Sequence, residues 1–187
     1  MEAVAAKGNS TVGFLRRNFR ECSNEVRKAT YTTMVRPVLE YASSVWDPHQ
    51  KEDIDRLEKV QKRAARYACN NYFERTPGTI TSMLQQLKWN SLEQRRRHNR
   101  LGMLYRIENG LVDLQPSTFY RHSDSRTRGG NKIYQEHAAH RTTHNAFFAR
   151  TISEWNKLPS AITSASSLNV FLQRLTAVDQ QSDSATY

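Results

Sequence analysis

Apolar residues recur at helical spacing along most of the chain. The clearest case is residues 51–68, where Ile54, Leu57, Gln61, Ala64 and Ala68 follow one another at steps of three or four residues. At about 100° per residue these positions form one stripe along a helix. The pattern therefore predicts an amphipathic helix that packs on its neighbours through this stripe.

Shorter helical patterns precede and follow this segment. One begins at Thr11, and Ser23 and Asn24 offer capping oxygens for a second helix, which Pro37 should kink or restart by removing a backbone donor. Residues 79–87 predict a further short helix. Beyond it, Ser91 and Gln94 match a capping box. The helix that this box opens should bury Leu101, Leu104, Ile107 and Leu111 and end at Asn109-Gly110.

The helical pattern disappears between Leu111 and Ala146, where glycine, proline and polar residues are frequent. This segment has room for a short hairpin around residues 132–134, and helical patterns return at 146–157 and 168–175. The predicted fold class is all-α or nearly so: a helical bundle with a long irregular basic segment. We expect a frayed amino terminus at 1–10, a helical region at 11–110, the irregular segment at 111–145, carboxy-terminal helices at 146–176 and a disordered tail at 177–187.

Composition agrees with a folded, soluble protein. With 187 residues, 37% of them hydrophobic, the chain has material for one domain or one domain with an appendage. Two cysteines, Cys22 and Cys69, are too few for a disulfide framework, and no segment has signal-peptide character or bilayer-spanning length. We expect an intracellular protein, nuclear or cytoplasmic, without a membrane partner.

Basic residues are concentrated in the middle of the chain. The sequence has 28 Lys and Arg against 18 Asp and Glu, a formal charge of +10. Between Arg56 and Arg106, twelve basic residues stand against three glutamates. Such a concentration points to a polyanion, although a basic helix face that is merely solvated is the alternative. The narrow apolar stripes favour nucleic acid over a membrane surface.

Two groups of basic residues are the candidate nucleic-acid-binding residues. The first lies opposite the apolar stripe of residues 51–68, and the second occupies the amino-terminal half of the next long helix, where the helix dipole disfavours cations and a nearby anion would offset that placement. The residues are Arg56, Lys59, Lys62, Arg63 and Arg66, followed by Arg95, Arg96, Arg97 and Arg100.

Five motifs in order resemble one family. The stretch VRPVLEYASSVWDP at residues 35–48 is similar to the signature found downstream of the catalytic palm in LINE-type reverse transcriptases, especially jockey-like non-LTR retrotransposons. The other motifs are Phe14-Leu15-Arg16-Arg17-Asn18, residues 57–66, residues 91–96, and Phe147-Phe148-Ala149-Arg150 running into residues 155–159. Together they cover most of residues 11–175, so the chain resembles the thumb and downstream region of such an enzyme.

The resemblance implies an RNA-directed DNA polymerase fragment that grips template and primer and is inactive alone. In the family, palm aspartates hold the Mg²⁺ ions of a two-metal reaction. The nearest look-alike here, Tyr41-Ala42-Ser43-Ser44, offers hydroxyls in place of carboxylates, so we expect no catalytic residue and no cofactor in this chain. The implied partners are RNA and DNA, bound largely without sequence preference, and the palm and fingers of the same polymerase. A domesticated stand-alone DNA-binding module and a protein-interaction remnant are the competing hypotheses.

Three weaker expectations follow. His137, His140 and His144 have zinc-compatible spacing, but no cysteine follows Cys69, so we expect no metal site.

Tyr67, Tyr72 and Phe73 could stack on bases or could be core or cap contacts. Without a palm to pack against, the first two helices should expose an apolar surface around Phe14, Leu15, Phe19, Val38 and Leu39.

Overall fold

The computed structural model describes residues 1–123, 132–134 and 146–184, with side chains described to residue 179. Within these ranges the regular secondary structure is helical, which confirms the predicted all-α class. The chain divides into two compact units, Met1–Arg96 and Arg97–Tyr187. The boundary therefore falls inside a helix, well before residue 110 where the sequence pattern changes.

The helices of the first unit are α1 (Glu2–Asn18), α2 (Asn24–Thr30), a π-helical turn (Tyr31–Val35), α3 (Arg36–Glu40), α4 (Ser43–Trp46), α5 (Lys51–Ala68) and α6 (Thr79–Leu87). Helix α7 (Leu92–Glu108) begins in the first unit and continues into the second. The second unit then has a 3-10 turn (Pro116–Thr118), α9 (Phe147–Trp155), α10 (Ser160–Thr163) and α11 (Leu168–Ser184). Helices α5 and α6 span the predicted residues.

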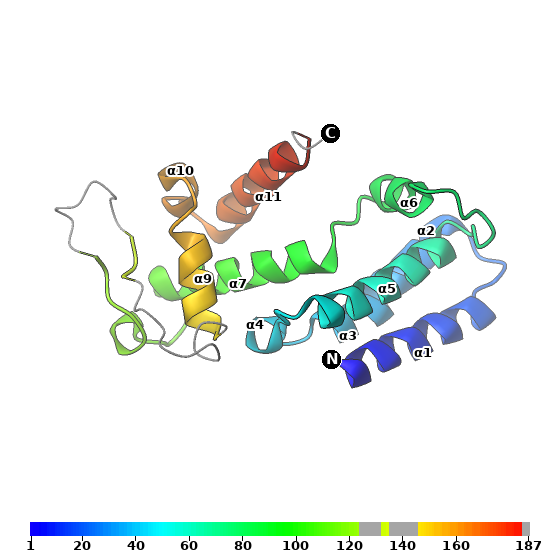
Figure 1. The fold of residues 1–187 in the computed structure, drawn as a ribbon, viewed down its shortest axis with the longest axis horizontal. Helices are drawn as coiled ribbons and strands as arrows, with labels where there is room; N and C mark the ends of the chain where they lie inside the picture. Colours follow the sequence, from blue (N-terminus) through cyan, green and yellow to red (C-terminus); the bar gives the residue numbers. More distant parts are fainter. Residues whose placement is uncertain (124–131, 135–145, 185–187) are drawn as a thin grey trace. The chain divides into compact units, whose positions relative to one another are not determined.

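Helix α1 lies beside α5 and runs in the same direction, as Figure 1 shows. The expectation of a frayed amino terminus is wrong, because the helix begins at Glu2 and buries Ala5, Gly8 and Val12. These small residues form a stripe too weakly hydrophobic to stand out in the sequence. The stripe brings the two helices close together: a Cβ at Gly8 would lie 2.8 Å from Leu39 Cδ2 and 3.1 Å from Val60 Cγ1.

The first unit has its own core, which corrects another expectation. Leu15 and Leu39 are fully buried in it, and Phe19 packs against it, so these three residues do not form the expected exposed surface. Phe14 alone of the expected set is among the large exposed side chains, at 44%. The reason is that α1, α3 and α5 cover one another's apolar faces.

Pro37 and the buried Gln61 determine local structure in the first unit. Pro37 restarts the helix as predicted, and the turn before it is π-helical, with the Arg36 N–H donating to the Tyr31 carbonyl. Tyr31 stacks on Trp89 with 4.1 Å between ring centroids, and burial raises the pKa of its hydroxyl to about 12. Gln61, inside the predicted stripe, donates to the Asn90 carbonyl at 2.8 Å. Its burial is therefore satisfied by a hydrogen bond.

The second unit is held by an aromatic and aliphatic core from α7, α9, α10 and α11. Tyr105 and Trp155 both stack on Phe171, and the Tyr105 hydroxyl donates to the Ala165 carbonyl at 2.7 Å. Leu101, Leu104 and Ile107 are buried as predicted, whereas Leu111 is 59% exposed because α7 stops before it, with Gly110 in the left-handed region. At the start of α7, in the first unit, Ser91 accepts from the Gln94 N–H at 3.1 Å, which confirms the predicted Ser91 cap.

Two further features of this unit bear on the sequence predictions. His122 and Ile133 form an antiparallel bridge, in agreement with the short hairpin allowed around residues 132–134. Helix α11 continues to Ser184, so the tail expected from residue 177 is helical over most of its length. None of the described helices is long and apolar enough to cross a membrane.

Candidate nucleic-acid interface

Helix α5 presents its basic side chains away from the core, as its pattern predicts. Lys59, Lys62 and Arg63 are exposed, while Arg66 is half-buried and donates to the Glu74 carbonyl at 2.7 Å. Arg56 is different, because it pairs with Glu52 at 2.7 Å and Asp53 at 3.0 Å on its own helix. Of the five expected residues of α5, the exposed ones therefore lie in the carboxy-terminal two thirds of the helix.

The arginines at the start of α7 have partners within the protein. In the first unit, Arg95 forms a two-pronged contact with Glu40, and Arg96, which is 0% exposed, donates through Nε to Asp47 Oδ1 at 2.8 Å. The hydrogen bonds that Arg95 donates to the Glu40 carboxylate raise the pKa of Arg95 above its ordinary value. Both guanidinium groups thus join α7 to the segment around α3 and α4.

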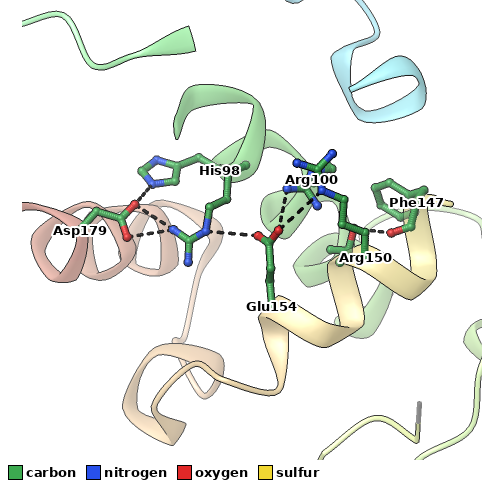
Figure 2. A network of polar contacts seen from close by, with 8 residues as sticks. His98, Arg100, Phe147, Arg150, Glu154 and Asp179 are labelled. Carbon is green, nitrogen blue, oxygen red and sulfur yellow. Dashed lines mark hydrogen bonds and ion pairs between the residues drawn. The ribbon is translucent and has the colours of Figure 1, made fainter. Parts of the chain in front are cut away.

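In the second unit, a polar network joins α7, α9 and α11, and Figure 2 labels His98, Arg100, Glu154 and Asp179 in it. Arg97 belongs to the same network. Arg97 donates to Asp179 of α11 at 2.8 Å and approaches Glu154 of α9 at 3.2 Å. Arg100, only 2% exposed, donates to the same glutamate at 2.9 Å, and His98 lies 2.6 Å from the Asp179 carboxylate.

These contacts correct the interpretation of the second group of expected residues. An anion does offset the unfavourable placement of cations near the start of α7, but the anions are Glu40, Asp47, Asp179 and Glu154 of the protein itself. Burial removes Arg96 and Arg100 from the surface where phosphate would bind. Sequence spacing could not show this, because each carboxylate lies about fifty or more positions away along the chain.

A different set of arginines gathers beside α5. Two adjoining hollows, of about 840 and 820 Å³, share Gly13, Arg16, Tyr67, Tyr72 and Phe73 in their walls. We call them together the α1–α5 groove. Its further basic lining consists of Arg17, Arg20 and Arg27 in one hollow and Arg63, Arg66 and Arg75 in the other. Glu21 is the sole carboxylate residue among these described lining residues.

The groove is built from three segments that the fold brings together. Helices α1 and α5 run in the same direction, so the arginines near the end of α1 lie near those at the end of α5. The loop after α5 closes the groove and is fixed by hydrogen bonds: Arg66 donates to the Glu74 carbonyl, and Asn71 donates to the Glu74 carboxylate at 2.8 Å. Arg27 is buried and holds the α1–α2 turn by donating to the Phe19 and Arg20 carbonyls.

The groove also contains aromatic side chains. Tyr67 is buried, and its hydroxyl lies 3.1 Å from that of Thr30, so it is a core contact. The guanidinium of Arg16 lies 4.4 Å from the centroid of the Tyr72 ring, a cation–π contact. Phe73 is 92% exposed. The three aromatics considered together in the sequence therefore have different environments.

Four groove arginines are not among the residues expected from the sequence: Arg16, Arg17, Arg20 and Arg75. The first two stand inside one of the family-like motifs, but the four arginines gather only because α1 packs against α5. Lys59 and Lys62 are exposed, although they are not among the lining residues of the groove.

The residues that the structure describes offer no candidate metal site. Across those ranges, no three His, Cys, Asp or Glu side chains are grouped to hold a metal ion. His137, His140 and His144 lie outside the described residues, so the expectation of no cofactor stays a prediction. Cys22 and Cys69 are free and partly buried.

Comparison of the chain with protein-family models, curated proteins and solved structures returns no match.

Proposed function

We propose that the chain binds nucleic acid through its phosphate backbone, as the gripping part of a reverse transcriptase that does not polymerise alone. The observation that carries the proposal is the α1–α5 groove, which brings six arginines from three segments to one surface: Arg16, Arg17, Arg20, Arg63, Arg66 and Arg75. Contacts to phosphate give affinity that does not depend on base sequence. The link to retrotransposons rests on the five motifs and their order.

The groove arginines differ from those of α7 in what surrounds them. Among the described residues, Arg17, Arg20 and Arg63 have no carboxylate within ion-pair distance, whereas each arginine of the α7 group has one. Clustered cations repel one another, and a polyanion relieves that repulsion while it releases its own counterions. A groove of this kind is therefore suited to a ligand with regularly spaced negative charges.

The test is the salt dependence of binding to duplexes of random sequence. If five phosphates are neutralised, log affinity should fall with log salt with a slope of about −4.5, at about −0.9 per contact. Changing Arg17, Arg20 and Arg63 together to Glu should weaken binding to all sequences and bring the slope to about −2, since three contacts are lost. Thermal stability should fall only slightly, because the three side chains are exposed. The expected losses are the hydrogen bond from Arg63 to Asn9 at 2.9 Å and the favourable position of Arg17 in the last turn of α1.

A matched variant separates groove binding from simple net charge. Lys88, Lys132 and Lys157 are exposed and lie outside the groove, so changing all three to Glu alters the net charge equally. This variant should keep the steep salt slope of the parent. Salt-insensitive binding by the parent, or equal loss in both variants, would reject the groove as the binding surface. Strong discrimination between duplex sequences would instead favour a domesticated DNA-binding module.

A further inference from the structure

Phe73 is held in an exposed position by its loop. The Asn71 N–H donates to the Arg66 carbonyl at 3.0 Å, and the Glu74 N–H donates to the Asn71 side chain at 3.2 Å. Arg66 and Asn71 also donate to Glu74. The residues on both sides of Phe73 are thus tied to α5, yet the ring is 92% exposed. A large apolar side chain in such a position loses the favourable burial available to it and suits a ligand.

The neighbours of Phe73 in the groove restrict what that ligand is. Phe73 lines both hollows, one with Arg17 and Arg20 and the other with Arg63, Arg66 and Arg75. Guanidinium groups that line the same hollows as an aromatic ring match a chain that alternates phosphates with flat bases. An apolar peptide would leave these cations without partners.

The aromatic ring further restricts the form of the nucleic acid. In a blunt duplex the bases already stack on one another, so a protein ring can add little to them. An unpaired base has a free face, and stacking on an aromatic side chain contributes about 1–3 kcal/mol per base. Tyr72 is less available than Phe73, because it is half-buried and Arg16 lies over its ring.

We propose that Phe73 is a stacking platform for an unpaired base, so that the α1–α5 groove takes single-stranded nucleic acid in preference to blunt duplex. This inference rests on the proposed function, since the groove arginines hold the phosphates on each side of the stacked base. The Phe73 ring gives the preference for single-stranded over duplex nucleic acid, and the arginines supply the salt-dependent part of the affinity.

The experiment compares binding of the full chain to a short single strand of mixed sequence and to the blunt duplex of the same length. Phe73→Ala should weaken single-strand binding by about 5- to 150-fold, the equivalent of losing one stacked base. Duplex binding and the salt slope should not change, because no charge is removed. Phe73→Trp should restore the preference for the single strand, and a 2-aminopurine base in that strand should lose fluorescence on binding to parent but not to Phe73→Ala.

Phe14→Ala is the matched control, because Phe14 is an exposed aromatic on α1 that does not line the groove. It should bind single strand as tightly as the parent. If the parent binds both ligands but Phe73→Ala changes neither affinity, the stacking inference is overturned and the proposed function stands. If the parent binds neither ligand at low salt, the proposed function itself fails.

Discussion

The two glycines in the middle and end of α1 allow a direct test of how closely this helix approaches its neighbours. A Cβ at Gly8 would lie 2.8 Å from Leu39 Cδ2 and 3.1 Å from Val60 Cγ1, whereas at Gly13 the nearest atom is Arg17 Nη1, at 3.5 Å. Both sites are helical, so replacement by alanine gains about 1 kcal/mol of helix propensity at each. Overpacking in a buried contact costs about 1–3 kcal/mol, and only Gly8 should incur that cost.

Gly13→Ala should therefore raise the free energy of unfolding by about 1 kcal/mol. The free energy of unfolding of Gly8→Ala should be about 1–3 kcal/mol lower than that of Gly13→Ala. The difference between the two variants removes the propensity contribution, which is common to both. Urea unfolding followed by circular dichroism measures each value, and an unchanged m-value would show that the compared states are the same. Equal stabilisation by both substitutions would refute the close contact between α1, α3 and α5.

Three further predictions concern the polar contacts. Asp47→Asn should destabilise the first unit by about 3–5 kcal/mol in urea unfolding, because the buried Arg96 guanidinium loses its countercharge. Asp179→Ala should speed amide exchange at the end of α11, since its contacts with Arg97 and His98 are lost. Burial raises the pKa of Glu58 above its ordinary 4.5, so folding favours its protonated form and stability should fall as pH rises from 4.5 through the folded pKa. Glu58→Gln should flatten that slope in pH-dependent unfolding.

Local patterns were sufficient for the elements that carry their own signals. Helix α5 matches its predicted range because its apolar stripe is long and regular, and the start of α7 matches because Ser91 caps it with a local hydrogen bond. The expectations for residues 1–10 and 177–184 are wrong, because neither segment carries a strong local signal for a helix. The buried stripe of α1 consists of small residues that are buried by packing against α5. Helix α11 continues past residue 177, where Asp179 pairs with Arg97.

Local pattern likewise predicts some residues of the candidate site and not others. The basic face of α5 follows from its helical wheel, so Lys59, Lys62 and Arg63 are exposed as expected. The arginines of α7 show the same local pattern but a different environment, because Glu40 and Asp47 come from distant positions. The groove itself could not be predicted, since it requires α1 and α5 to lie in parallel and the loop after α5 to present Phe73 between their arginines.

The parallel arrangement of α1 and α5 also bears on the groove when it is empty. Arg16 and Arg17 lie in the last turn of α1, and Arg66 lies in the last turn of α5. Each helix carries about half a negative charge at its carboxy-terminal end, which favours cations there. The carboxy-terminal ends of α1 and α5 both lie near the groove arginines, and their negative charge offsets part of the repulsion among these arginines. The helix ends therefore stabilise the groove when no ligand is bound. A phosphate that binds there competes with the negative ends of these helices for the same arginines. This competition lowers the affinity of the groove for phosphate and makes release of the nucleic acid easier.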